Sequence, residues 1–241
     1  MKYCYLILKQ FFALSVLFLG VSLFFSCSKS PEEKAQSFLK EYISEYLQEP
    51  STYAPVETVC DSLYNNVFLD KSVRERTVEY IALKKAARDI EIDENNTKYA
   101  LNRAGANNGL YQIVPTNMRG AYENQQLEKS SQNILRLQKK LKSLAEDKIK
   151  NAEMQAECLK YIKDKYETLS KDTFVGWQIH LKYRFASSTG HEVRRNSLFF
   201  LDQNMEHLLM DEINLDYNGH PLMEILTTLE SILDVENLIE R

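Results

Sequence analysis

Apolar and polar positions recur along this chain with two different periods, and the first regular stretch has the period of a helix. Beginning at Ser30 the residues Ser-Pro-Glu-Glu supply an N-cap, a proline at the first helical position and a capping box completed by Glu33. The apolar residues that follow are spaced by three and four: Phe38, Leu39, Tyr42, Ile43, Tyr46 and Leu47. They predict an amphipathic helix that ends at Pro50, and an extended segment over Tyr53–Cys60 in which Pro55 favours an edge position.

Two more helical stretches flank a polar interval in the middle of the chain. Lys71–Ile92 has spaced apolar residues among dense charges and predicts a second helix. Residues 95–109 are rich in asparagine and contain two glycines, so we expect a loop there. From Gln125 to Leu169 the apolar residues again repeat at three or four, which is typical of a coiled coil. This long helix is expected to pair either with the second helix, as an antiparallel hairpin, or with another copy of the chain.

After Asp172 the period of the pattern changes from helical to alternating, which indicates a half-buried strand. Apolar residues at odd positions alternate with polar ones: Val175, Trp177, Ile179, Leu181, Tyr183 and Phe185 against Gly176, Gln178, His180, Lys182 and Arg184. Turn residues separate this strand from a second over His191–Leu201 and a third over His207–Ile213. We therefore expect an antiparallel meander.

The second strand has apolar residues on both faces, so its register against the first stays open. They are Val193, Phe199 and Leu201 on one face, and Leu198 and Phe200 on the other. Pro221 begins a last amphipathic helix. Together the elements predict an α+β fold, with N- and C-terminal helices on a small antiparallel β-meander and a long helical hairpin as an insertion. The expected segments are residues 27–64 with the first helix and the edge strand, residues 65–171 as the helical insertion, and residues 172–241 with the β-meander and the last helix.

The start of the chain has the layout of an export signal, so residues 1–26 are expected to be a signal peptide. Two lysines accompany an apolar run from Phe11 to Phe25, and no acid occurs in this region. The run ends in Leu-Phe-Phe-Ser-Cys, which resembles the lipobox of bacterial lipoproteins in the looser, aromatic form of Bacteroidota-type lipoproteins. The resemblance implies cleavage before Cys27, its acylation, and, from Ser28, sorting to the outer membrane, on either its periplasmic or its surface face. The alternative is an uncleaved membrane anchor.

Two further pieces, Glu45–Val56 and Phe174–Asp202, resemble small uncharacterised Bacteroidota-type lipoproteins. In those proteins an N-terminal helix packs on a hairpin with a Gly-Trp start, here Gly176-Trp177. The likeness leaves out the long helical middle of the chain. It implies a fold and a location, and no activity.

Charge and cysteine content narrow the classes of partner. Removing residues 1–26 takes away two lysines and no acid, so the net charge of −4 becomes −6. An acidic domain without a basic stripe is not expected to bind nucleic acid. Once Cys27 is acylated, Cys60 and Cys158 remain as thiols, and an oxidising compartment would allow a disulfide between them. Two buried free thiols are the equal alternative.

The sequence contains none of the motifs that would indicate catalysis, a cofactor or a metal site. There is no nucleophile elbow and no glycine-rich phosphate loop. The four histidines, at positions 180, 191, 207 and 220, lack the spacing of metal ligands. We therefore expect no catalytic residue, no cofactor and no metal.

Two patches are candidate binding sites. The first is an anion-binding face on the hairpin, formed by His180, Lys182, Arg184, Arg194 and Arg195, and its alternative is the solvated face of a sheet. The second is a glycan-binding loop, formed by Tyr99, Asn102, Arg103, Asn107, Asn108 and Tyr111, and its alternative is a plain interhelical loop.

The sequence thus favours a noncatalytic cell-envelope lipoprotein that acts as a binding or scaffold module. Its partners would be the membrane, through the lipid, and an envelope protein or glycan, with self-association through the helical hairpin as a further possibility. The alternative is an envelope hydrolase that acts on glycan or peptide. A deep pocket with converging polar groups and strongly shifted pKa values would favour the enzyme.

Overall fold

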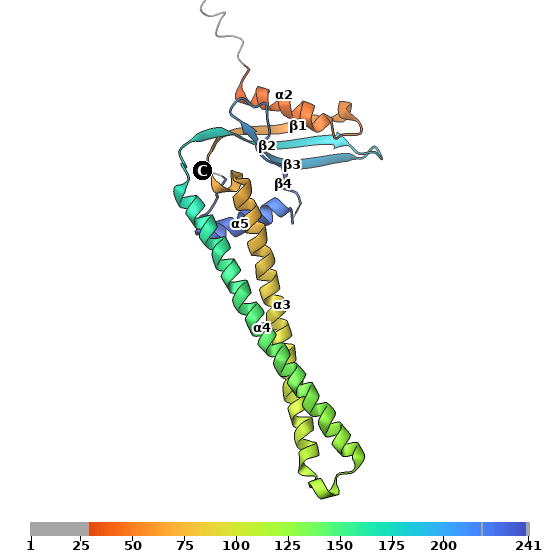
Figure 1. Cartoon of the computed structure of the whole chain (residues 1–241). Coiled ribbons are helices and arrows are strands. Elements are labelled where there is room, and N and C mark those ends of the chain that lie inside the picture. The colour runs from red at the N-terminus through yellow and green to blue at the C-terminus, as the bar shows by residue number, and fades with distance from the viewer. Residues whose placement is uncertain (1–28, 218, 240–241) are drawn as a thin grey trace, which may run out of the picture. The chain divides into compact units, whose positions relative to one another are not determined.

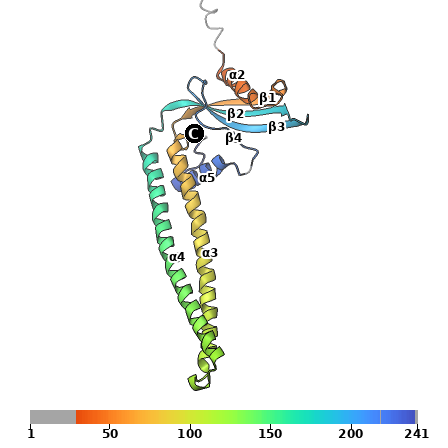
Figure 2. The same ribbon diagram turned by 45° about the vertical axis from the view of Figure 1, so that its right-hand side comes forward.

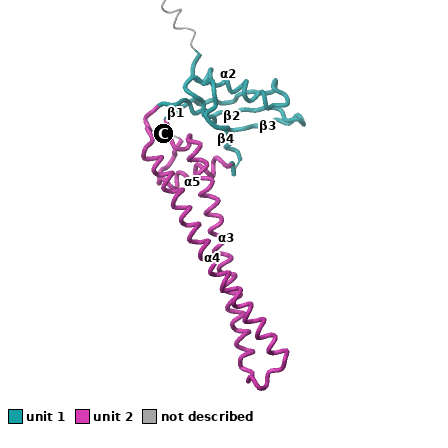
Figure 3. Tube along the Cα trace, viewed as in Figure 1, with its two compact units in different colours: residues 1–64, 174–220 teal, residues 65–173, 221–241 magenta. Residues whose placement is uncertain are grey.

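The structure, a computed structural model, describes residues 29–217 and 219–239 (Figure 1). It divides into two compact units, each built from two stretches of chain (Figure 3). Unit 1 comprises residues 1–64 and 174–220, and unit 2 comprises residues 65–173 and 221–241. The expected α+β fold class is confirmed. The expected signal peptide and lipid attachment site at Cys27 lie outside the described residues.

Unit 1 begins with helix α2 (Pro31–Ser44), and the predicted capping box is present. The backbone N–H of Glu33 donates to the Ser30 hydroxyl at 3.2 Å, and the N–H of Ser30 donates to the Glu33 carboxylate at 3.1 Å. These two bonds satisfy donors that the first turn of a helix would otherwise leave free. The helix ends before Tyr46 and Leu47, which belong to the same apolar stripe in the sequence and lie in the following turn.

The sheet of unit 1 is antiparallel with the strand order β1-β2-β3-β4 (Figure 2). Its strands are β1 (Ala54–Tyr64), β2 (Phe174–Ala186), β3 (Glu192–Asp202) and β4 (Ile213–Asn214). The extended segment after the first helix is an edge strand, as Pro55 indicated. A short 3-10 turn, η1 (Pro50–Thr52), leads into it.

The register between β2 and β3 decides which apolar residues of β3 meet α2. Ile179 faces Phe199, and Trp177 faces Leu201. Phe199 and Leu201 therefore share a face with the apolar residues of β2, and this face packs on Ala35, Leu39 and Ile43 of α2: Ile179, Leu181, Tyr183, Phe199 and Leu201. Each fully buried large apolar side chain contributes about 1.5–3 kcal/mol. The core of unit 1 is therefore the layer between α2 and the sheet.

The third strand, expected over His207–Ile213, is wrong for most of its length. Within this segment, only Ile213, the first residue of β4, pairs regularly with β3, whereas Leu208 forms a single bridge to Leu201. The carboxylate of Asp202 accepts hydrogen bonds from two backbone N–H groups of the following turn, at 2.8 and 3.3 Å, and Met205 has a φ of 60°. Bends continue from this turn through residues 209 and 210, where a strand would have to be extended.

Unit 2 is built on two long helices that form an antiparallel hairpin, which we call the helical arm (Figures 1 and 2). Its helices are α3 (Lys71–Ile113) and α4 (Ala121–Thr168), with the short turns η2 (Val67–Leu69) before α3 and η3 (Thr116–Met118) between them. Helix α5 (Pro221–Leu233) packs on both long helices, and Lys85 of α3 pairs with Glu224 of α5 at 3.3 Å. We expected this helix to accompany the meander, and the structure groups it with the arm.

The loop expected over residues 95–109 is wrong, because α3 runs through it without a break. Thr97 and Ala104, seven residues apart, are buried against α4, and the Ser130 hydroxyl reaches the carbonyl of Ala104 at 3.5 Å. Packing along the hairpin outweighs the low helix propensity of asparagine and glycine.

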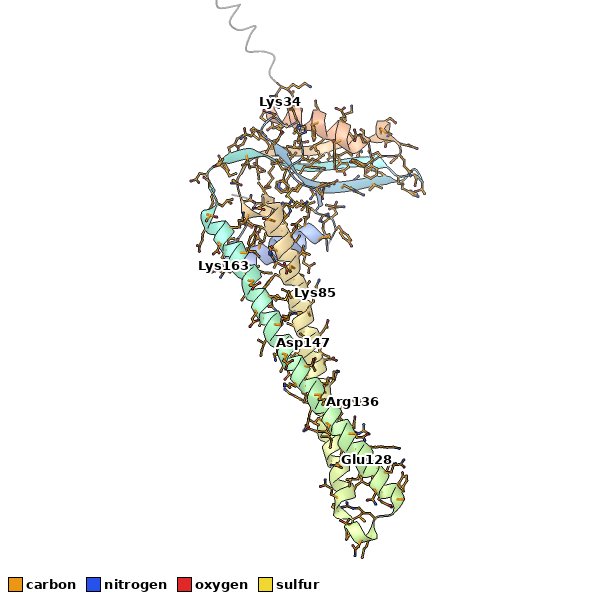
Figure 4. All side chains as sticks on the ribbon, viewed as in Figure 1. Lys34, Lys85, Glu128, Arg136, Asp147 and Lys163 are labelled. Atoms are coloured by element: carbon orange, nitrogen blue, oxygen red, sulfur yellow. The ribbon has the colours of Figure 1, made fainter. Side chains whose placement is uncertain are left out.

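The buried seam of α4 has the spacing of a coiled coil. Leu137, Leu144, Asn151 and Cys158 follow one another at seven-residue intervals and are all buried. Asn151 is the polar member, and its side-chain amide donates to the carbonyl of Leu83 on α3 at 3.1 Å. Charged side chains cover the outside of the arm, where Figure 4 labels Lys85, Arg136, Asp147 and Lys163. The described part of the chain holds no helix with the length and apolar content to cross a membrane.

Candidate functional site

Three adjoining hollows follow one flank of α2, and we call them the α2 groove. The opposite flank is tied to β1, where the Gln36 amide donates to the Thr58 hydroxyl at 2.9 Å. The first hollow, of about 300 Å³, lies between Lys34 and Trp177. The second, of about 390 Å³, shares Met205 with the first and Tyr42 with the third, whose volume is about 350 Å³. The hollows therefore adjoin one another at Met205 and at Tyr42.

The third hollow, which we call the aromatic end of the groove, is the richest in rings. Its lining residues come from α2 and the turn after it, from β2, from β3 and from the residue before β4: Tyr42, Ile43, Tyr46, Leu47, Tyr183, Phe185, Arg195 and Glu212. Tyr42 and Tyr46 meet edge to face with ring centroids 5.2 Å apart, and Tyr183 stacks on Phe185 at 6.0 Å. Tyr46 is 71% exposed, so one ring face is open to a ligand.

The aromatic end also contains one anionic side chain, Glu212, and one cationic side chain, Arg195. Glu212 accepts hydrogen bonds from the Tyr183 hydroxyl, at 3.4 Å, and from the buried Ser197 hydroxyl. The guanidinium of Arg195 lies 5.7 Å from the centroid of the Phe185 ring. Arg195 takes part in none of the ion pairs found among the described residues, so its charge is available to a ligand.

Tyr53 and Tyr183 stay protonated at physiological pH. Burial, followed by the negative charge of Glu212, raises the pKa of Tyr183 to about 12 against a smaller lowering by Arg195. Burial also raises the pKa of Tyr53 to about 12, and its ring centroid lies 5.7 Å from that of Tyr183. Groups with such pKa values are protonated at neutral pH and can donate hydrogen bonds.

The anion-binding face expected on the hairpin is divided by the sheet. His180, Lys182, Arg184 and Arg194 share one face, because Arg184 is paired with Arg194 in the β2–β3 register. Arg195 lies on the opposite face, in the α2 groove.

The cations of that face have carboxylate partners at close range. Lys182 lies 2.6 Å from Glu57, and Glu192 lies 3.3 Å from Arg184 and 2.9 Å from Arg194. The contact with Lys182 lowers the pKa of Glu57, chiefly through its hydrogen bond. Charge on this face is therefore largely compensated within the sheet.

The glycan-binding loop is wrong as a loop, because all six of its residues belong to α3. Tyr99, Asn102, Arg103 and Asn107 are exposed, whereas Asn108 and Tyr111 are half-buried. With a rotation of about 100° per residue, the six side chains point to several sides of the helix and do not converge on one ligand.

Cys60 in β1 and Cys158 in α4 are free thiols, and they belong to different units. Burial raises the pKa of the Cys60 thiol to about 12 and also raises that of Cys158. Both thiols are therefore poor nucleophiles at neutral pH. Within the part of the chain that the structure describes, no three His, Cys, Asp or Glu side chains are gathered so as to hold a metal ion.

The α2 groove was missed in the sequence because its residues have ordinary structural explanations there. Tyr42 and Tyr46 belong to the apolar stripe of the first helix, and Glu212 stands beside Asp211 as a solvated pair. The groove forms because α2 ends before Tyr46, and because the pairing of β2 with β3 places Arg195 on the face that α2 covers. The chain matches no protein-family model, no curated protein and no solved structure.

Proposed function

We propose that this protein is a noncatalytic cell-envelope lipoprotein that binds an envelope partner in the α2 groove. The lipobox-like sequence before Cys27 supports export, acylation and placement at the outer membrane. The observation that supports binding is the aromatic end, where exposed and half-buried rings surround an Arg195 that pairs with none of the described carboxylates.

A glycan is the ligand class that fits these groups best. Tyrosine rings offer a flat apolar face and a polar edge, which suit the two kinds of surface on a sugar ring. Arg195 can donate paired hydrogen bonds to the carboxylate of an acidic sugar, and Glu212 can accept from sugar hydroxyls. The adjoining hollows along α2 give room for further sugar units beyond the aromatic end, and Glu41, Glu45 and Glu206 of the second hollow can accept hydrogen bonds from their hydroxyls.

The lining of the aromatic end supports binding rather than hydrolysis. Glycoside hydrolysis uses two carboxyl groups that face each other across the bond to be cut. Among the described residues that line the aromatic end, Glu212 alone carries a carboxylate, and it accepts from Ser197 and Tyr183; the other carboxylates of the α2 groove, Glu41, Glu45 and Glu206, line the adjoining hollows. The strongly shifted pKa values nearby belong to Tyr53 and Tyr183 and lie far above neutrality.

Titration with uronic acid-containing oligosaccharides, followed by ¹H–¹⁵N NMR, tests the proposal. We expect chemical-shift changes at the aromatic end, and a Kd about tenfold higher for Tyr46→Ala and for Arg195→Ala, which corresponds to one lost strong contact each. Arg194→Ala is the matched control for Arg195, because it removes the same side chain from the opposite face. Tyr217→Ala removes an exposed tyrosine that does not line the groove.

Three outcomes would contradict this function. No chemical-shift change at the aromatic end would exclude it as the glycan site. An equal loss of affinity in the Arg194→Ala and Tyr217→Ala controls would show that the effect does not come from the groove. Shortening of the oligosaccharide during the titration would favour the envelope hydrolase instead.

A further inference from the structure

The turn that joins α3 to α4 concentrates exposed apolar side chains, and we call residues 99–122 the arm tip. Five large apolar or aromatic side chains there are among the most exposed of the described residues: Ile113 at 77%, Met118 at 73%, Tyr99 at 72%, and Leu110 and Tyr122 at 66% each. Elsewhere in the described chain, of the exposed large apolar side chains, Tyr46 alone reaches this range. Single exposed apolar residues are ordinary, whereas a group of them marks an interaction surface, and four of these five lie at or within a few residues of the turn: Leu110, Ile113, Met118 and Tyr122.

The arm tip also differs from the rest of the chain in charge. Asp and Glu make up 34 of the 241 residues, yet none occurs between Asn95 and Tyr122. The arm tip holds two basic residues, Arg103 and Arg119, whereas Lys98 just before it pairs with Glu94 at 2.5 Å. An apolar and cationic turn therefore stands on a chain whose net charge is −4.

The turn is held in shape from within, without burial of its apolar side chains. Arg119 donates from Nε to the carbonyl of Val114 at 2.7 Å, and from Nη2 to the carbonyl of Gln112 at 3.0 Å. These bonds satisfy carbonyls that the end of α3 leaves without helical partners. Ile113 and Met118, next to this clamp, remain exposed.

We propose that the arm tip inserts into the headgroup region of an anionic phospholipid bilayer. Leu110, Ile113 and Met118 would enter the boundary between headgroups and acyl chains, where apolar side chains of interfacial segments are buried. Tyrosine is favoured at the level of the headgroups, which suits Tyr122 beside the turn. The cationic side chains would meet the negative surface potential of the lipids.

The charge and shape of the arm tip favour a bilayer over the other occupants. Two copies of the tip would bring Arg103 and Arg119 of each copy together, with the Glu123 carboxylate beside Gly120 as the nearest opposite charge in the sequence after Tyr122. A convex turn can insert into a lipid headgroup layer, whereas a peptide ligand needs a concave surface on the protein that binds it. This inference does not depend on the α2 groove or on acylation at Cys27.

Flotation of the protein with lipid vesicles tests the inference. The chain from residue 27 on carries Cys27→Ser, so that no acyl chain contributes and every described element is kept. We expect it to float with vesicles of phosphatidylcholine and phosphatidylglycerol in equal parts, and more weakly with phosphatidylcholine alone. Arg103→Gln should weaken partition into the mixed vesicles about fivefold, the effect of one cationic side chain near an anionic surface.

The decisive comparison uses two triple variants of the arm. Leu110→Ser, Ile113→Ser and Met118→Ser together should lower partition more than tenfold, because each apolar side chain loses its burial in the interface. Ile92→Ser, Leu135→Ser and Ile149→Ser replace exposed apolar residues of the same helices away from the tip and should bind as the parent does. Circular dichroism would show that both variants keep their helices.

Each other result overturns the inference. No flotation with the mixed vesicles excludes insertion of the tip. An equal loss in the two triple variants assigns binding to general hydrophobicity. A parent that sediments as a dimer, and that becomes a monomer in the tip variant without floating in either form, assigns the tip to a second copy of the chain.

Discussion

At the scale of single residues, Gly176 occupies a position that no side chain fits. It lies near the start of β2, and a Cβ atom there would stand 1.9 Å from the carbonyl oxygen of Leu201 on β3. We expect Gly176→Ala to lower the free energy of unfolding by about 3 kcal/mol, measured by urea denaturation, because a backbone atom must shift. Gly109→Ala is the control, since its Cβ meets nothing within 4 Å and alanine should gain about 1 kcal/mol in a helix. Equal effects would contradict the clash.

Tyr53 is one of the buried groups, with Tyr183 and Cys60, that make the stability of the protein sensitive to alkali. Its pKa rises to about 12 on folding from an ordinary value of 10.0, so the unfolded chain loses the proton first. The contribution to stability is complete below pH 10 and falls by up to about 2.7 kcal/mol as the pH rises to 12.

Tyr53→Phe should therefore flatten the alkaline part of the curve of unfolding free energy against pH. The substitution is mild, because the Tyr53 hydroxyl is buried without a hydrogen-bond partner among the described residues. Tyr217→Phe, at an exposed position, is the control and should leave the curve unchanged. A parallel loss of stability in parent and Tyr53→Phe would disprove the assignment.

The role of a residue could be predicted from the sequence where its partner is close in the chain, and not where the partner comes from a distant element. Ser30 was identified because its partner Glu33 is three residues away in the same turn. Arg194 and Arg195 are neighbours in sequence, and alternation sends them to opposite faces. Their faces follow from the β2–β3 register, which the mixed apolar pattern of β3 left open.

At the scale of elements, the arm depends on a seam that is partly polar. Asn151 donates to the carbonyl of Leu83 on the other helix, and Gln155 donates to Asn151 at 2.5 Å. We expect Asn151→Ala to lower the free energy of unfolding by about 1 kcal/mol relative to Asn124→Ala, an exposed substitution in the same helix. Urea denaturation followed by helical circular dichroism would measure the difference. Equal stability of the two variants would show that the bond contributes nothing.

The length of α3 could have been predicted from the length of its partner, because the two helices of a hairpin pack along their whole length only if they are similarly long. The coiled-coil pattern from Gln125 to Leu169 requires a partner about twice as long as Lys71–Ile92. Local propensity at Asn107 and Gly109 indicated a loop, whereas the partner helix supplies the contacts that keep α3 regular. At 1.5 Å per residue, α3 is about 65 Å long.

At the scale of the whole molecule, acylation at Cys27 is the prediction to measure first. We expect the intact mass of the membrane-extracted protein to match cleavage before Cys27 plus acyl chains. A Cys27→Ala variant should lose that mass and leave the outer-membrane fraction, because its lipid attachment site is gone. An uncleaved mass without lipid would instead make the N-terminal apolar run a membrane anchor.

The chain order of the two units also sets an order of events in folding. β1 and β2 pair directly, yet the whole arm separates them in sequence, so the sheet is a contact of long range that forms slowly. The arm is a local hairpin, and at its base the N–H of Asn65 donates to the carbonyl of Thr173 at 2.8 Å. Once it closes, Tyr64 and Phe174 are already neighbours, and the cost of closing a long loop has been met. The arm is thus expected to fold before the sheet and to bring β1 and β2 together. A substitution that destabilises the arm would therefore also slow the refolding of the sheet, although the sheet belongs to the other unit.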